Sequence, residues 1–394
     1  MGKLLVYLKD YKKESVLGPL FKLLEASFEL IVPLVMAAII DHGVADGDKP
    51  YIMKMCLVLV LLAVIGLTCS ITAQYFAAGS LLGVALHQGT SFPVGKVDFL
   101  DLYPLNFREF LCAMGEKQFV SMLDSCDTQM VTVFKTKYIE RLREYYFVGG
   151  MPEVVKDFSE KKDYNRVRAI QKNLINYYQQ DFSKHAEIKL VPRLNLVWNS
   201  IPMQLAKENK KYIYGQVREG SRAKDFELAI QWLLDCGLIH KVQRIQKPDL
   251  PLKAYIDFDA FKLFLVDIGL LIAMTDLDAK VIIEGNKIFT EYKGSLTEQY
   301  ILQQLISDVG VIPYYYSTQN SKGEIDFLVQ GKTSVIPIEV KAEENLKAKS
   351  LKAFCEKYQP SYAVRTSMSD YREQDWMTNI PLYAIKWIEN YVNQ

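Results

Sequence analysis

The chain has 394 residues, half of them apolar, and its 47 basic and 46 acidic residues give a formal net charge of +1. This balance excludes a bulk electrostatic attraction to nucleic acid, so any such binding depends on local basic patches. The six cysteines form no Cys-x-x-Cys pair, which argues against a zinc site or a disulfide framework. The length is sufficient for two or three domains.

Two apolar segments near the N-terminus are candidates for membrane-spanning helices. No Asp, Glu, Lys or Arg occurs between Lys54 and Lys96, and the apolar run 55–73 approaches the roughly 20 residues that cross a hydrocarbon core. The earlier apolar segment 17–40 contains charged residues, so hydropathy alone supports it less well. We predict a helical hairpin with an acidic turn at 41–48.

The charged flanks predict the orientation of this hairpin. Lysines precede the first segment and acidic residues fill the turn, so the positive-inside rule places both ends in the cytoplasm. A cleaved signal peptide is not expected, because the apolar run is distant from Met1 and no small-residue cleavage site follows it. We expect residues 15–79 to attach the chain to the cytoplasmic membrane, with residues 80–394 in the cytoplasm. The alternative is a buried helix pair in a soluble protein.

The same segment carries a family resemblance. L-L-V-Y-L-K-D-Y-K-K at 4–13, P-L-V-M at 33–36 and I-I-D-H-G at 39–43 resemble the start of the transmembrane region of exporter-type ABC transporters. The resemblance covers residues 1–79, the first two helices of a larger helical unit. Two helices do not form a translocation path, so we expect no transport activity.

Shorter elements follow the hairpin. The pattern predicts a strand at 94–102 and a helix whose N-terminal cap is Asn106. Further helices continue to about residue 180, and the Gly-Gly and Pro residues within 147–153 predict a turn between two of them.

This region resembles the last part of the ATPase core in a prokaryotic family of AAA-type ATPases. The similar motifs are A-G-S-L-L at 78–82, Y-P-L-N-F-R-E-F-L at 103–111 and V-G-G-M-P-E-V-V at 148–155. In that family the A-G-S motif ends the strand that bears the sensor residue. Ser80 is the one residue here that could have sensed nucleotide, and we expect it to be a solvated or capping hydroxyl in this chain. No G-x-x-x-x-G-K-[ST] loop occurs to hold phosphates, so we expect neither ATP binding nor ATPase activity. The two resemblances meet at residues 76–82, which we interpret as a junction between two truncated proteins.

The next region has the order of elements of a winged helix. Apolar residues at helical spacing and Gly237 predict a helix that ends there, followed by strands at 239–245 and 253–258. Basic residues of this region that could contact nucleic-acid phosphates are Lys207, Lys210, Lys211, Arg218, Arg222 and Lys224. Acidic residues interleave with them, so a solvated helical face is the alternative.

The last hundred residues bring acidic side chains into an otherwise apolar pattern. Glu298 lies on the apolar face of a predicted helix, where a carboxylate requires a partner. Glu339 and Lys341 are two residues apart in a predicted strand and therefore share a face. Asp326 lies across a tight hairpin from them. We expect these four side chains to converge at one end of an α/β layer.

This order of residues resembles the PD-(D/E)xK nuclease superfamily. The resemblance implies Asp326 and Glu339 as Mg²⁺ ligands, Lys341 as the residue that activates water, and Glu298 as a supporting catalytic residue. Arg365 and Ser367 match the same pattern and could contact a phosphate or close the sheet edge. A relic network of ion pairs without catalysis is the alternative.

The predicted fold is multidomain, with a transmembrane α-hairpin, an α/β ATPase-core remnant, a winged-helix region and a restriction-endonuclease-like α/β domain. Their predicted bounds are 1–79, 80–155, 156–280 and 281–394. Two functions follow from different classes. One is a DNA-associated, truncated AAA-type protein with a Mg²⁺-dependent nuclease-like domain. The other is a non-catalytic, membrane-anchored binding or assembly module. The sequence does not predict an oligomeric state.

Overall fold

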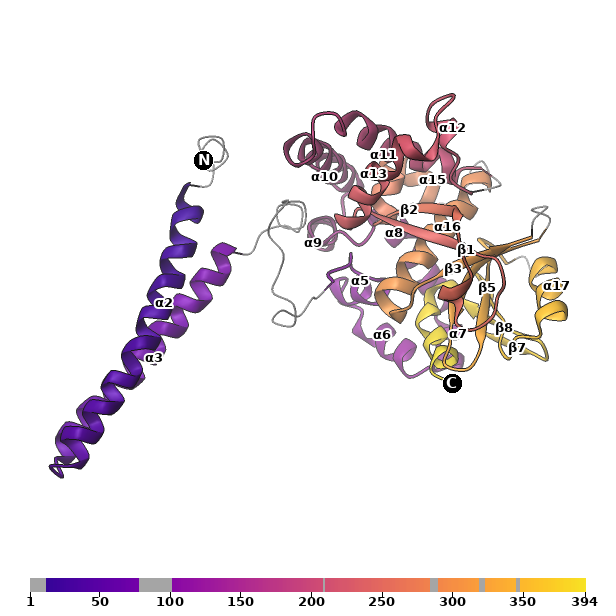
Figure 1. The fold of residues 1–394 in the computed structure, drawn as a ribbon. Helices are drawn as coiled ribbons and strands as arrows, with labels where there is room; N and C mark the ends of the chain where they lie inside the picture. Colours follow the sequence, from indigo (N-terminus) through magenta and orange to yellow (C-terminus); the bar gives the residue numbers. More distant parts are fainter. Residues whose placement is uncertain (1–11, 78–100, 208–209, 284–289, 319–322, 345–347) are drawn as a thin grey trace. The chain divides into compact units, whose positions relative to one another are not determined.

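The computed structural model describes residues 12–77, 101–207, 210–283, 290–318, 323–344 and 348–394. They belong to two compact units, Met1–Thr90 and Ser91–Gln394. The chain is multidomain, with two N-terminal apolar helices, a helical middle region and a C-terminal mixed sheet (Figure 1).

Some sequence predictions fall outside the described residues. They include Ser80, most of the predicted strand 94–102 and most of the junction at 76–82. The described residues 101–106 form neither helix nor strand, so no part of the predicted strand is seen there.

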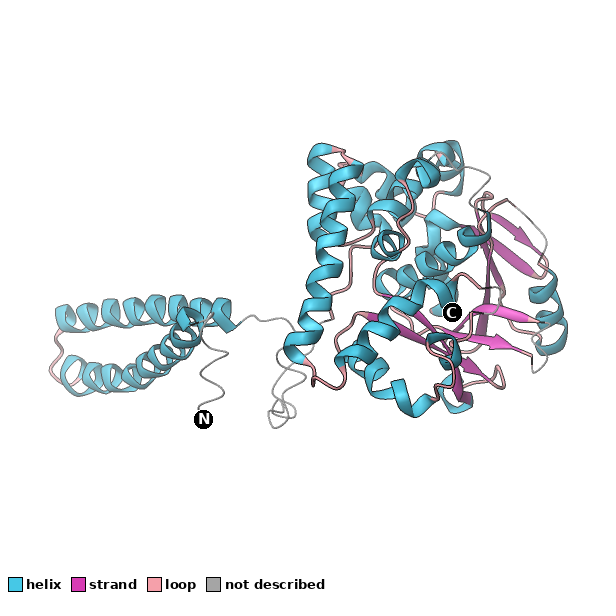
Figure 2. Cartoon of the chain, turned by 90° about the horizontal axis from the view of Figure 1, so that it is seen from above, coloured by secondary structure: helices cyan, strands magenta, loops and turns pink. Residues whose placement is uncertain are grey.

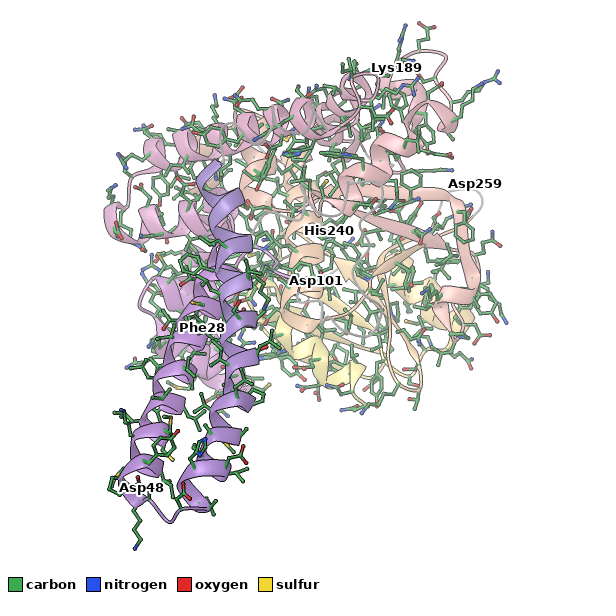
Figure 3. The ribbon with its side chains drawn as sticks, turned by 60° about the vertical axis from the view of Figure 1, so that its left-hand side comes forward. Phe28, Asp48, Asp101, Lys189, His240 and Asp259 are labelled. Carbon is green, nitrogen blue, oxygen red and sulfur yellow. The ribbon has the colours of Figure 1, made fainter. Side chains whose placement is uncertain are left out.

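The first unit is a hairpin of two long helices. Helix α2 (Lys12–Ala38) continues into a π-helical segment, η1 (Ile39–Val44), and α3 (Lys49–Ala77) packs back along it (Figure 2). The turn is shorter than the predicted 41–48, because helical backbone extends to Val44. Figure 3 shows Asp48 at the tip of the hairpin, where its carboxylate accepts a hydrogen bond from the N–H of Tyr51 at 3.1 Å.

The large apolar side chains of this hairpin face outward. Leu30 is 75% exposed and Leu57 is 69% exposed. The segments Leu20–Val44 and Lys49–Thr72 are long and apolar enough to cross a membrane, although signal sequences and buried core helices share these properties. The Thr68 hydroxyl donates to a carbonyl of its own helix at 2.8 Å, so it does not require water.

The second unit begins with helices connected by tight turns. These are α5 (Phe107–Ala113), α6 (Lys117–Asp124), α7 (Thr128–Val133), α8 (Lys135–Val148) and α9 (Pro152–Lys161). The predicted cap at Asn106 is confirmed, since its side chain accepts from the N–H of Glu109 and the Glu109 carboxylate accepts from the N–H of Asn106, both at 2.9 Å. The predicted turn separates α8 from α9. A Cβ at Gly150 would lie 2.2 Å from the Leu105 carbonyl oxygen, so this turn requires glycine.

The middle of the second unit is helical. Its helices are α10 (Tyr164–His185), α11 (Val191–Leu205), α12 (Tyr214–Val217), α13 (Ala223–Asp235), α14 (Ile268–Met274) and α15 (Ala279–Ile283). The predicted helix before Gly237 is confirmed as α13, whose apolar side, including Phe226 and Leu233, is buried. Gly237 adopts φ +67°, as expected of a residue that ends a helix.

A mixed sheet of eight strands forms the C-terminal half, in the order β2-β1-β3-β4-β5-β6-β8-β7. The strands are β1 (Ile239–Ile245), β2 (Ile256–Leu265), β3 (Tyr314–Ser317), β4 (Glu324–Gln330), β5 (Val335–Val340), β6 (Val364–Ser367), β7 (Arg372–Gln374) and β8 (Met377–Pro381). Strands β1, β3, β5, β6 and β8 run in the same direction, so their carboxyl ends meet at one edge.

The predicted strand pair at 239–245 and 253–258 is present as β1 and β2, with one correction. The second strand begins at Ile256 and continues to Leu265, and β1 also pairs with β3. The pair is therefore continuous with the C-terminal sheet. An isolated two-stranded hairpin is marginally stable, and pairing with β3 supplies the hydrogen bonds that it would otherwise lack.

Helix α16 (Thr290–Gln304) connects the sheet to the earlier helices through glutamine side chains. Gln299 accepts from the N–H of Leu265 at 3.0 Å and donates to its carbonyl at 2.7 Å. Gln304 accepts from the N–H of Phe107 at 2.8 Å. The remaining short elements are η2 (Leu252–Tyr255), η4 (Leu305–Val309), α17 (Lys349–Tyr358), η5 (Leu382–Ile388) and α18 (Glu389–Val392).

Candidate functional site

The four predicted site residues lie on helix α16, on strands β4 and β5, and directly after β5. Glu298 is on α16, Asp326 on β4 and Glu339 on β5, while Lys341 directly follows β5. Strands β4 and β5 are antiparallel neighbours, as the predicted hairpin requires. The site therefore lies where the carboxyl ends of the parallel strands meet.

Glu298 is 6% exposed, and two lysines face its carboxylate. Lys210 Nζ donates to Oε1, and Lys262 Nζ lies 3.7 Å from Oε2. Burial opposes ionisation of Glu298, but the two ammonium groups lower its pKa below the ordinary value. The sequence predicted that this buried carboxylate requires a partner. The structure shows two lysines in that position.

Lys262 belongs to this cluster, although the sequence analysis did not identify it. It is 1% exposed on β2, its Nζ pairs with Glu324, and the same nitrogen lies 4.9 Å from the centre of the Tyr315 ring. Burial favours the neutral amine, but the charges of Glu298, Glu324 and Asp326 raise its pKa. The sequence feature that could have identified Lys262 as a buried residue is its position within the apolar stretch 260–265.

Asp326 faces the same cluster but has less positive charge available to it. Its Oδ2 accepts from the N–H of Val340 at 2.7 Å, which ties it to β5. Burial and the negative charge of Glu298 raise the pKa of Asp326 to about 7. The pKa values of the two carboxyl groups are therefore shifted in opposite directions, and the charged form is favoured at Glu298.

Glu339 and Lys341 form a second group. Lys341 Nζ lies 2.7 Å from Glu339 Oε1, which confirms that the two side chains share a face. Glu339 is 4% exposed, and its Oε2 has no hydrogen-bond partner among the described residues. In the sheet, Glu339 lies beside Arg365, and Arg365 lies beside Asn379.

Arg365 and Ser367 are buried within this second group. The Arg365 Nε donates to Asn379 Oδ1 at 2.9 Å, and the Ser367 hydroxyl donates to the same oxygen at 2.8 Å. Burial lowers the pKa of Arg365, and the charge of Glu339 opposes this effect. The contacts of Arg365 and Ser367 with Asn379 connect β6 to β8.

Helix α17 lies close enough to Glu339 for the charge of this carboxylate to act on it. Burial and the charge of Glu339 raise the pKa of the Cys355 thiol on α17 to about 11. Within the described residues, no three Asp, Glu, His or Cys side chains are grouped so that they could hold a metal ion.

Within the described residues, the acidic side chains of the Glu298 cluster lie against lysines. Magnesium requires several hard oxygen ligands in octahedral geometry. Here Glu298 Oε1 accepts a hydrogen bond from Lys210 Nζ, and Oε2, 3.7 Å from Lys262 Nζ, has no hydrogen-bond partner among the described residues. The positive charge at this end of the sheet comes from lysines.

The residues predicted to bind nucleic acid are not equally accessible. Arg222 and Lys224 are exposed at the start of α13, whereas Lys207 and Lys211 are half-buried. Lys210 pairs with Glu298, and Arg365 is buried in the sheet. Arg218, Arg222 and Lys224 are thus the exposed members of this set.

Two sequence families match parts of the second unit. A domain of unknown function, DUF8612, matches residues 139–281, and a second domain of unknown function, DUF4143, matches residues 293–385. DUF4143 is found in AAA-ATPase-associated proteins. No curated protein and no solved structure matches the chain.

Proposed function

We propose that this chain is a non-catalytic, membrane-anchored binding or assembly module whose second unit carries a nuclease-like sheet. The observation that carries this proposal is the position of Lys210 and Lys262 against Glu298. A nuclease of the type that the sequence resembles would direct Glu298 toward a metal ion. In this chain two ammonium groups neutralise the carboxylate.

The ion pairs also give the buried acidic residues a structural role. Removing one partner from a buried ion pair leaves an uncompensated charge, which is strongly destabilising. Glu298 and Lys262 therefore stabilise the fold as a pair, without a need for catalysis. The DNA association and the lack of ATPase activity that we expect from the sequence are part of the same proposal.

Membrane attachment through α2 and α3 completes the proposed role. The exposed apolar side chains of the hairpin would be covered by lipid, and the hydroxyl groups of Thr68 and Thr72 already bond within α3. Such an anchor would hold the second unit, with exposed Arg222 and Lys224, at the cytoplasmic face of the membrane.

A Mg²⁺-dependent nuclease is the second candidate. The observation that favours it is the unsatisfied Oε2 of Glu339, since a buried carboxylate oxygen without a donor is a place for a cation.

A plasmid-cleavage assay separates the two candidates. The detergent-solubilised full chain is incubated with supercoiled DNA and Mg²⁺, beside the matched double variant Asp326→Ala/Lys341→Ala. We expect equal background from both proteins. Mg²⁺-dependent nicking that is lost in the double variant would overturn the non-catalytic assignment and establish the nuclease.

A further inference from the structure

A polar cavity lies at the carboxyl ends of β1 and β3, and no residue of the Glu298 cluster lines it. Its volume is about 480 Å³. The lining residues are Arg244, Gln246, Tyr316, Ser317, Thr318, Lys357 and Tyr358. All seven side chains are polar and none is a carboxylate, so this cavity favours an anion.

Arg244 is held in a fixed orientation at one side of the cavity. Its Nε donates to Asp257 Oδ2 at 2.9 Å, and its Nη2 contacts the same oxygen. Burial opposes ionisation of Asp257, but Arg244 lowers its pKa, so the carboxylate remains charged and keeps the guanidinium in place. A guanidinium has five N–H donors, and these contacts use only part of them.

Hydroxyl groups line the opposite side. The phenol oxygens of Tyr316 and Tyr358 lie 2.8 Å apart, and Lys357 Nζ lies 4.8 Å from the centre of the Tyr358 ring. The Tyr316 ring packs edge-on against Phe354, 5.4 Å between centroids, which fixes its position. Ser317 and Thr318 add two more hydroxyls at the end of β3.

The chemistry of the lining selects among ligands. A divalent cation would require oxygen ligands with negative charge, which the seven lining residues do not offer. An apolar ligand would leave the polar groups without partners. A phosphate group, with several acceptor oxygens and a negative charge, matches one guanidinium, one ammonium and four hydroxyls.

The place and the size of the cavity agree with a small ligand. In α/β sheets, ligands commonly bind beyond the carboxyl ends of the strands. The volume is in the lower part of the range of roughly 300–1,000 Å³ for small-molecule pockets. We propose that this cavity binds a phosphate monoester, with Arg244 and Lys357 as the cationic contacts. The site shares no residue with the Glu298 cluster, so this inference does not depend on the proposed function.

Calorimetric titration of the full chain in detergent tests this proposal. The probes are inorganic phosphate, adenosine 5′-monophosphate and adenosine, with a single-stranded oligonucleotide bearing either a 5′-phosphate or a 5′-hydroxyl. We expect the monophosphate to bind at least about tenfold more tightly than adenosine, because a charge-assisted hydrogen bond contributes that much. Preference for the 5′-phosphorylated oligonucleotide over the monophosphate would identify a nucleic-acid end as the source, and the reverse preference a free metabolite.

A matched pair of variants on α17 locates the binding. Lys357→Gln should weaken binding of the monophosphate about tenfold. Lys352→Gln removes the same charge from the same helix at an exposed position that does not line the cavity, and should leave binding unchanged. Equal binding of the monophosphate and adenosine, no binding of any phosphate probe, or equal effects of the two variants would overturn the proposal.

Discussion

The helical hairpin and the second unit differ in where their apolar and charged side chains lie. In the hairpin, leucines such as Leu30 and Leu57 face outward. The second unit has a core in which apolar residues such as Leu233 and Ile301 are buried, and charged residues such as Lys262 and Glu298 are buried with them. The hairpin thus presents an apolar surface, whereas the second unit pairs its buried charges internally.

This contrast shows that apolar composition alone does not indicate how a segment is stabilised. A hydrocarbon environment would stabilise the hairpin by covering its outer surface. The second unit is stabilised by its own core and by compensated ion pairs. Substitutions in the hairpin and in the second unit can therefore disturb each environment separately.

Replacing Lys262 with Met should disturb the second unit most. The change leaves Glu324 without its ion-pair partner and Glu298 with Lys210 alone, and we expect a loss of about 3–5 kcal/mol in the free energy of unfolding. All four tryptophans lie in the second unit, so tryptophan fluorescence during denaturant unfolding of the detergent-solubilised chain reports on this unit.

Lys247→Met is the matched control for this variant. Lys247 forms an exposed ion pair with Asp249 at 2.7 Å, and losing it should cost less than about 1 kcal/mol. Equal losses in the free energy of unfolding for the two variants would contradict a larger contribution from the buried cluster.

Replacing Leu61 with Asp should disturb the hairpin. Leu61 is exposed near the middle of α3, and an aspartate at the centre of a membrane helix costs about 2.5–3.5 kcal/mol on insertion scales. We expect part of the protein to move from the alkali-washed membrane pellet to the soluble fraction. Leu228→Asp, at an exposed leucine of the second unit, should leave the distribution unchanged. A soluble wild-type chain would contradict the membrane anchor.

Replacing Asp326 with Asn should change the pH dependence of stability. The pKa of Asp326 is raised to about 7 in the folded chain from an ordinary value of 3.8. Between these pH values the folded state keeps a proton that the unfolded state has released, so the free energy of unfolding falls as the pH rises. The slope from this group is at most about 1.4 kcal/mol per pH unit.

The asparagine variant lacks this titration and should show a flatter profile between pH 4 and 7 than wild type. Its amide oxygen can still accept the hydrogen bond from Val340. Parallel stability profiles for the two proteins across this window would contradict the raised pKa.

Local features of the fold were predictable because short-range rules determine them. The cap at Asn106, the turn containing Gly150 and the helix end at Gly237 each follow from neighbouring residues. The continuity of β1 with β3 was not predictable, because the partner strand lies about 70 residues further along the chain. The end of β2 at Leu265 was not predictable either, because pairing with Ile239 and contacts with Gln299 determine it.

In the candidate site, too, short-range rules predict some features and long-range packing determines the others. Strand periodicity placed Glu339 beside Lys341, and helical periodicity placed Glu298 on a buried face. The sequence could not show that Lys210 and Lys262 face Glu298, because long-range packing brings three separate segments together there.

The glutamines of α16 have a consequence for how the second unit unfolds. Gln299, Gln303 and Gln304 bond to backbone groups of β2, α14 and α5, which come from regions far apart in the sequence. If α16 separated from them, buried backbone groups on all three elements would lose their hydrogen bonds together. The regions 139–281 and 293–385 should therefore unfold in one cooperative transition, with similar protection of their core amides from hydrogen exchange.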